Sequence, residues 1–250
     1  MADDIARAER KIDKAIRKLE PPSKEADPYA FPTPCRVRLC GASGSFKTHF
    51  ITRYLCTYGL KQFDQLVWLC PSRAGLGVQG KLSLVEKTFG IYATFIHCDG
   101  GIPTEELQAV LDHGRKQGFS TAVVADDLMQ LGKKEKKALE SIFLHGRHSN
   151  VSVFELVQNI YDGSKSNRLS STAFCLGDFA EKSQVARFAK EICATKAKAD
   201  LLTRCYSRIV EADRHSCLIV VLNCESTKSN PLRCRHGDMR ILIPELWSLG

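Results

Sequence analysis

Eight residues, Gly41 to Thr48, have the types and spacing of a phosphate-binding loop. They read GASGSFKT, where the usual pattern is G-x-x-x-x-G-K-[ST]. Gly41, Lys47 and Thr48 stand at their expected positions, whereas Phe46 stands where the second glycine is usual. In such a loop the backbone N–H groups and the positive end of a helix converge on one point, which suits a polyphosphate. The spacing therefore predicts binding of a nucleoside triphosphate.

Different residues of this loop are expected to do different tasks. Lys47 is expected to reach the β- and γ-phosphates, and the Thr48 hydroxyl is expected to bind Mg²⁺. The backbone between them would approach the phosphates. The residues predicted to bind the cofactor are therefore Gly41, Ala42, Ser43, Gly44, Ser45, Phe46, Lys47 and Thr48.

Phe46 leaves two alternatives open. If the loop needs a glycine for close approach or for a positive φ, phenylalanine would strain the backbone by about 1–3 kcal/mol or block the nucleotide. If its Cβ points away from the phosphates, the ring would pack beside the loop or near the base. Because the other chemical groups of a nucleotide site are present, we favour the second alternative.

Two adjacent carboxylates, Asp126 and Asp127, follow the apolar stretch 121–125. A hydrophobic strand that ends in an acid, downstream of such a loop, is typical of the second half of an NTP site. Asp126 is expected to hold Mg²⁺ through water, and Asp127 to orient or deprotonate the attacking water. A turn that merely caps a helix could also read Asp-Asp. Since the two half-motifs occur in the expected order, we favour the nucleotide site.

Two further side chains flank the apolar stretch 151–157. Gln158 follows it, at the edge of the sheet where ligands bind in open α/β folds, and could sense the γ-phosphate. An ordinary amide at a strand end is the alternative. Arg147 precedes the stretch and could reach across a subunit boundary as an arginine finger. A solvated surface arginine is the alternative there, and Arg168 is a rival for the same role.

The elements that must position these groups alternate along the chain. Strands are expected at 36–40, 65–70, 93–98, 121–127, 151–158, 172–176 and 217–223. Helices are expected at 49–55, before Gly90, at 103–118, 133–145, 182–194 and 197–212, and the polar stretch 159–171 is expected to be mobile. Such alternation predicts an α/β fold with a mainly parallel sheet and helices on both faces.

The N-terminal part has a different pattern. Residues 1–20 contain a helical stripe and are expected to form an arm, either docked on its own domain or packed on a neighbouring subunit. Residues 21–34 are rich in proline and are expected to be a linker. Residues 35–250 are expected to form one P-loop domain.

Composition narrows the class of protein. The longest strongly apolar run, 217–222, is too short to span a bilayer, and the charged N-terminus lacks a signal-peptide core. The sequence therefore predicts no membrane insertion and no secretion. The eleven cysteines include no C-x-x-C pair, so we expect reduced thiols rather than disulfides or zinc. The net charge of +8 is compatible with a nucleic-acid partner.

Taken together, residues 36–240 resemble the poxvirus-type DNA-packaging ATPases of large DNA viruses, which belong to the FtsK–HerA superfamily of P-loop motors. The resemblance is carried by GASGSFKT, by VVADDL at 123–128 and by FLHGRHSNVSVFELVQN at 143–159. The segments 174–179, 182–192 and 217–235 are similar to the later parts of such proteins. Where the family normally has glycine, this chain has Phe46.

This resemblance implies a P-loop NTPase of the additional-strand, RecA/FtsK-like type. It implies a homo-oligomeric ring, expected to be a hexamer, that uses ATP and Mg²⁺ to thread double-stranded DNA into a preformed capsid. Lys47 and Thr48 would bind nucleotide and metal, Asp126 and Asp127 would be the hydrolytic acids, and Gln158 the sensor. Capsid or portal proteins would be partners, in the cytoplasm or nucleus of a host cell or with the virion.

Two other functions remain open from the sequence. The chain could be a non-hydrolysing nucleic-acid- or capsid-binding module that keeps the fold but has a degenerate loop. It could also be a helicase or recombination ATPase on the same fold, although nothing after Gln158 resembles helicase motifs.

Overall fold

The chain divides into two units, residues 1–30 and 31–250, in the computed structural model. The structure describes residues 30–31, 33–71, 91–99, 101–128, 132–193, 195–212, 215–222 and 233–236. The predicted N-terminal arm, most of the predicted linker and the helix predicted before Gly90 lie outside these residues. The second unit contains the predicted site.

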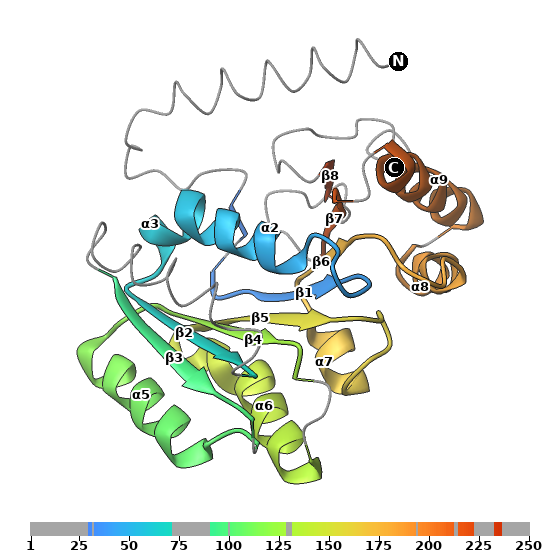
Figure 1. Ribbon diagram of the computed structural model, residues 1–250. Coiled ribbons are helices and arrows are strands. Elements are labelled where there is room, and N and C mark those ends of the chain that lie inside the picture. Colours follow the sequence, from blue (N-terminus) through green and yellow to red (C-terminus); the bar gives the residue numbers. More distant parts are fainter. Residues whose placement is uncertain are drawn as a thin grey trace. The chain divides into compact units, whose positions relative to one another are not determined.

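Eight described strands form one sheet in the order β3-β2-β4-β5-β1-β6-β7-β8 (Figure 1). Their bounds are β1 Arg36–Cys40, β2 Gln65–Cys70, β3 Tyr92–His97, β4 Thr121–Asp126, β5 Val151–Val157, β6 Ala173–Leu176, β7 Leu218–Val221 and β8 Arg233–His236. The pairs from β3 to β6 are parallel, and β7 and β8 add antiparallel pairs at one side. The predicted α/β fold with a mainly parallel sheet is therefore confirmed.

The described helices surround this sheet. They are α2 Lys47–Tyr54, α3 Leu60–Gln62, α5 Thr104–Gln117, α6 Lys133–His145, α7 Lys165–Ser170, α8 Ser183–Ile192 and α9 Lys196–Ala212, with a π-helical turn η1 at Leu55–Gly59 and a 3-10 turn η2 at Gly146–Ser149. Helix α2 lies on one face of the sheet, and α5 and α6 lie on the other (Figure 1). None of the helices in the described ranges is both long and apolar enough to cross a membrane.

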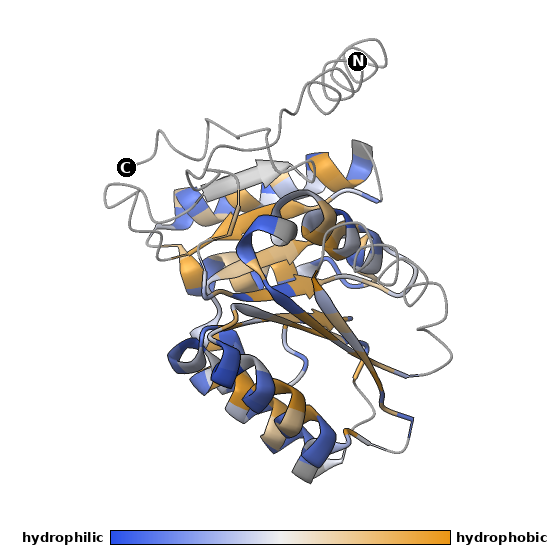
Figure 2. Ribbon diagram, turned by 90° about the vertical axis from the view of Figure 1, so that its left-hand side faces the viewer, coloured by the Kyte–Doolittle hydropathy of each residue, from blue (hydrophilic) through white to orange (hydrophobic). Residues whose placement is uncertain are grey.

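The central strands are buried along their whole length. Every residue of β2, β4 and β5 is buried, as expected for parallel strands covered on both faces. One apolar cluster joins β2–β5 to α5 and α6, and a second joins β1, β5, β6 and β7 to α8 and α9. Figure 2 shows the same layering, with apolar strands between helices whose outer faces are polar.

The stretch 159–171, expected to be a mobile loop, contains a hydrogen-bonded turn and helix α7. Ser164 begins this helix, since its Oγ accepts hydrogen bonds from the N–H groups of Ser166 and Asn167 at 3.0 and 3.4 Å. A serine N-cap satisfies backbone donors that would otherwise lack partners. The polar composition of the stretch did not by itself predict this cap.

The ordered core of the second unit begins before the predicted start at residue 35. Phe31 is 1 % exposed and packs on Tyr54 and Phe154, with ring centroids 4.9 and 6.4 Å away. Phe31 therefore belongs to the packed domain.

Candidate functional site

The loop 41–46 joins β1 to α2 and is held at both sides by neighbouring strand ends. The Gly41 N–H donates to the Val157 carbonyl of β5 at 3.1 Å, and the Ala42 N–H donates to the Asp178 carbonyl at 2.7 Å. Gly44 has a φ of +71° and open space where a Cβ would lie. A glycine is therefore suited to this corner, because other residues rarely adopt a positive φ. Strand, loop and helix follow one another as a phosphate-binding loop requires.

Phe46 lies beside the loop with its ring buried. Its φ of −81° and ψ of −17° are ordinary right-handed values, so the position needs no glycine for its backbone. The ring is 2 % exposed and packs edge-on against Phe50 at 5.8 Å. It occupies the space above Gly177, where an added Cβ would lie 2.0 Å from the Phe46 Cε1. A glycine at the end of β6 thus accommodates the ring, and no sequence motif marked Gly177.

Lys47 is the first residue of α2, two positions earlier than the predicted start of this helix. Its Nζ donates to the carbonyl oxygens of Gly41 and Ala42 at 2.6 and 2.8 Å, so the ammonium lies over the mouth of the loop. Burial lowers the pKa of Lys47, and the nearby carboxylates of Asp127 and Asp126 oppose this shift. The side chain is within reach of the point on which the loop converges.

Thr48 and Asp126 meet between α2 and β4. The Thr48 Oγ1 donates to the Asp126 Oδ2 at 3.3 Å. Burial raises the pKa of Asp126 to about 6, with a smaller contribution in the same direction from Asp127, while the Thr48 hydroxyl and Lys47 oppose the rise. Hydroxyl and carboxylate oxygens are the donors that Mg²⁺ prefers. A cation here would also offset the cost of holding a buried carboxylate ionised, so these residues fit the metal.

Asp127 and Gln158 lie at the ends of neighbouring strands and contact each other. The Gln158 Nε2 donates to the Asp127 Oδ1 at 3.1 Å. Asp127 has a φ of +53°, a left-handed conformation that is uncommon for any residue other than glycine. β4 ends one residue earlier than the predicted strand, at Asp126, and this turn directs the two acids differently: Asp126 is buried and Asp127 is exposed.

Arg147 lies at the amino-terminal end of the parallel strands, which here is called the amino edge of the sheet, whereas the loop lies at their carboxyl-terminal end, the carboxyl edge. It is exposed in η2, just before β5 begins, and its charge acts on Arg36 at the start of β1. Arg168 is nearer the carboxyl edge but is engaged, since its guanidinium lies 4.6 Å from the Tyr161 ring and its Nε lies 3.7 Å from Glu191. Neither arginine forms part of the group around Lys47.

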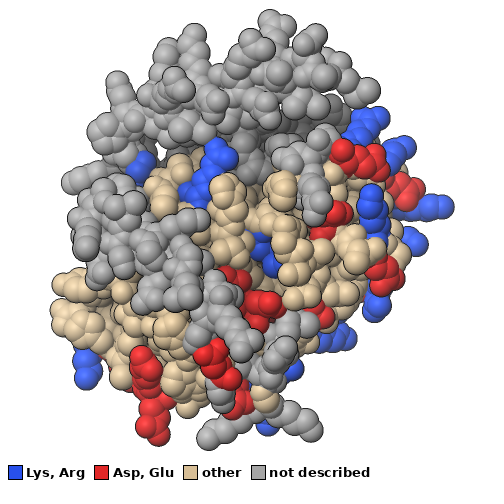
Figure 3. Space-filling model, in the orientation of Figure 1, with Lys and Arg blue, Asp and Glu red and all other residues tan. Residues whose placement is uncertain are grey.

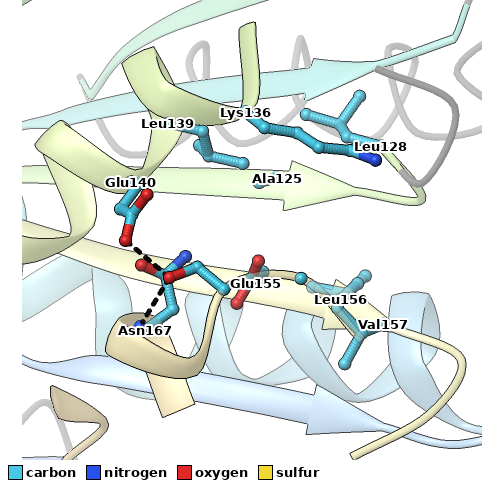
Figure 4. A pocket seen from close by; sticks show the side chains of 11 residues that line it. Ala125, Leu128, Lys136, Leu139, Glu140, Glu155, Leu156, Val157 and Asn167 are labelled. Carbon is cyan, nitrogen blue, oxygen red and sulfur yellow. Dashed lines mark hydrogen bonds between the residues drawn. The ribbon is translucent and has the colours of Figure 1, made fainter. Parts of the chain in front are cut away.

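A cavity of about 250 Å³ lies beneath the ends of β4 and β5 (Figure 4). Helices α6 and α7 form its other walls, and the Glu140 Oε1 accepts a hydrogen bond from the Ser164 hydroxyl at 2.5 Å across one end of it. Figure 4 shows the Glu155 side chain projecting toward this space from β5. The residues that line this cavity include none of the loop 41–46, so the cavity is separate from the loop.

Charged side chains of both signs are interspersed on the side of the molecule where α8 and α9 lie (Figure 3). The described residues of this face therefore present no uniform basic surface. Among the described residues, no cluster of three or more His, Cys, Asp or Glu could hold a metal ion. Cys224 and the side chain of Cys234 lie outside the described residues.

The sequence matches no family model and no curated protein. Solved structures do resemble the chain. The DNA-packaging ATPase B204 from Sulfolobus turreted icosahedral virus matches with a TM-score of 0.56 and 14% identity, over 77% of this chain and 95% of that chain. The genome-packaging NTPase B204 from Sulfolobus turreted icosahedral virus 2, in complex with ATP-γS, matches with a TM-score of 0.57 and 16% identity, over 77% of this chain and 95% of that chain. The same protein in complex with AMP matches with a TM-score of 0.56 and 17% identity, over 80% of this chain and 96% of that chain. The likeness is one of fold, so the expected resemblance to packaging ATPases is confirmed at that level.

Proposed function

We propose that this protein is an ATPase that drives double-stranded viral DNA into a preformed capsid. The observation that carries the proposal is a convergence of five chemical groups. Lys47 and Thr48 begin the helix after β1, Asp126 ends β4 with Asp127 next to it, and Gln158 directly follows β5. These three strands are neighbours in the sheet. The fold shared with packaging NTPases, one of them in complex with an ATP analogue, supports the choice of reaction and cargo.

Each group has a distinct task under this proposal. Lys47 exchanges its bonds to the Gly41 and Ala42 carbonyls for the β- and γ-phosphates. Thr48 and Asp126 hold Mg²⁺, which when bound neutralises charge on the phosphate oxygens. Because the Gln158 amide occupies one Asp127 oxygen, the other oxygen is left to accept a proton from the attacking water.

Assembly into a ring would supply a cation that the described residues of one chain do not bring to the loop. Arg147 lies at the amino edge of the sheet and its own loop lies at the carboxyl edge, so we propose that it serves the site of the next subunit. A homo-hexamer around the DNA, docked on a capsid or portal protein, completes the proposal. The protein would then act in the cytoplasm or nucleus of the host cell, or with the virion.

The decisive experiment measures ATP hydrolysis with and without double-stranded DNA, together with the mass of the assembly. We expect DNA to raise the rate, Lys47→Ala to abolish the stimulated activity, and the active species to be a ring. A rate that is unchanged by DNA and by Lys47→Ala would refute the proposal.

Two outcomes would favour the other functions instead. Nucleotide binding without hydrolysis, together with a large gain of hydrolysis in Phe46→Gly, would indicate a binding module with a crippled loop. Strand separation on a forked duplex would indicate a helicase. The unstrained backbone of Phe46 argues against the first of these.

A further inference from the structure

Arg38 is a fully buried arginine that no nucleotide-binding motif accounts for. It lies in β1, is 0% exposed and stands directly opposite Glu155 in the parallel pair of β1 with β5. Its Nε donates to the Glu155 Oε2 at 2.9 Å. Burying a guanidinium is costly unless it is paired and its N–H groups find acceptors. Such a group is kept inside a domain only when its contacts are extensive.

The other contacts of Arg38 go to the turn that follows Gln158. Its Nη1 donates to the Ile160 carbonyl at 2.9 Å, and its Nη2 donates to the Asp162 carbonyl at 2.6 Å. One rigid, planar group thus fixes two carbonyls of the same turn and one carboxylate of the strand before it. Lysine could not do this, because its ammonium is a single point at the end of a flexible chain.

The same turn is closed by further hydrogen bonds. The Asn159 N–H donates to the Asp162 Oδ2 at 2.7 Å, and the Ile160 N–H donates to the Gln184 Oε1 of α8 at 2.9 Å. The turn therefore has an anchor in α8 and an anchor in β1. Gln158, which contacts Asp127, is the residue immediately before it.

Apolar packing holds one side of this region, where Ile160 is 0% exposed within the cluster that includes α8 and α9, while a cavity borders the other side. Val157, Gly163 and Ser164 border the cavity beneath β4 and β5. A wall next to a cavity lacks the packing contacts that a filled core provides. On the cavity side the position of the turn accordingly depends on its hydrogen bonds, and Arg38 supplies two of them.

We propose that Arg38 is a positioning residue that fixes Gln158 against Asp127 through the turn 159–162. This inference rests on the proposed hydrolysis of ATP. Arg38 is also three residues before Gly41, whose N–H donates to Val157. Strand β1, which leads into the loop, therefore also holds the turn after Gln158. The distance between the loop and Gln158 is fixed in this way.

The test separates positioning from simple stabilisation. In Arg38→Met/Glu155→Met both charges are removed, and replacing a buried ion pair by apolar residues is often neutral for stability. We expect this double variant to melt near the wild-type temperature and to bind ATP with wild-type affinity. We expect its kcat to fall by about tenfold to a hundredfold, the scale of a small misplacement in an active site.

Two single variants control the interpretation. Glu155→Gln keeps an acceptor for the Arg38 Nε and leaves both bonds to the turn, so its kcat should stay near that of the wild type. Arg38→Lys keeps a charge beside Glu155 but cannot reach both carbonyls, so its kcat should fall even though it folds. If Arg38→Met/Glu155→Met does not fold, Arg38→Lys decides whether Arg38 positions the turn.

Hydrogen exchange makes the result independent of catalysis. Amides 159–162 should exchange faster in Arg38→Met/Glu155→Met and in Arg38→Lys, whereas those of β1 and β5 should stay protected. A folded double variant with wild-type kcat and unchanged exchange would overturn the inference. If the wild type itself does not hydrolyse ATP, the proposed function fails, and the exchange data alone decide whether Arg38 holds the turn.

Discussion

The two ends of β5 differ in what they bring together. At the carboxyl end, Gln158 contacts Asp127 and lies on the same edge as the nucleotide loop. At the amino end, Arg147 and Arg36 are like charges, and the pKa of Arg36 is lowered by its burial and then by Arg147. The strand between is seven residues long, or about 20 Å. At the carboxyl edge the candidate site residues of one chain contact one another, whereas at the amino edge Arg147 is exposed and far from the loop of its own chain.

Replacing Arg147 should have the largest effect and tests whether the amino edge takes part in hydrolysis. In Arg147→Ala we expect hydrolysis to fall by about a thousandfold or more, the range for an arginine finger, with nucleotide affinity unchanged. Mixing this variant with Lys47→Ala subunits should restore part of the activity, because some interfaces would then join an intact loop to an intact arginine. The control is Arg115→Ala, an exposed arginine of α5. Full activity in Arg147→Ala would make it an ordinary surface residue.

Replacing Lys47 tests the carboxyl edge alone. We expect Lys47→Ala to lower kcat by about a hundredfold to a thousandfold, because it removes a charge aimed at the developing negative charge. Affinity for ATP, measured by calorimetry, should fall as well, which distinguishes it from Arg147→Ala. Lys61→Ala, at an exposed position of α3, serves as the matched control and should be neutral. Equal affinities in the wild type and in Lys47→Ala would show that the loop does not hold the phosphates.

Phe46 and Gly177 test how the carboxyl edge is built. Phe46→Ala should lower the free energy of unfolding by about 3 kcal/mol, as for other buried aromatic truncations. Gly177→Ala should cost about 1–3 kcal/mol in the wild type, because its Cβ would overlap the ring. In the Phe46→Ala background the same change should cost much less, since the space is empty. Additive effects in denaturant unfolding would mean that the two residues do not share this space.

The smallest expected effect is on the pH dependence of stability without metal. The folded pKa of Asp126, about 6, lies above the ordinary aspartate value of 3.8, so the folded state binds the extra proton between these values. Stability should therefore be highest below about pH 4 as far as this group is concerned, and decline by roughly 2–3 kcal/mol as pH rises through 6. In Asp126→Asn this component should vanish. Urea unfolding in EDTA at several pH values measures it, and identical profiles for both proteins would contradict the assignment.

The sequence predicted the local pieces of this site better than their supports. The loop and the acid pair each lie in one short segment, so their spacing alone predicted that they would meet, as Thr48 and Asp126 do. Arg38 lies in the strand expected at 36–40, yet its partner Glu155 lies 117 residues away and only the sheet order brings them together. Gly177 carries no signal, because a glycine that makes room for a ring looks like any other glycine. Both pairs, Arg38 with Glu155 and Phe46 with Gly177, are brought together only by long-range packing.

The start of the packed domain is tied to the helix that begins at Lys47. The Phe31 N–H donates to the Tyr54 hydroxyl at 3.1 Å, the Tyr54 hydroxyl donates to Gln62 at 2.6 Å, and the Gln62 amide donates back to the Phe31 carbonyl at 2.9 Å. These bonds form a closed clasp at the far end of α2. Phe31 also packs on Phe154 of β5, so a displacement of the chain at Phe31 would act both on the far end of α2, which begins at Lys47, and on a central strand of the sheet.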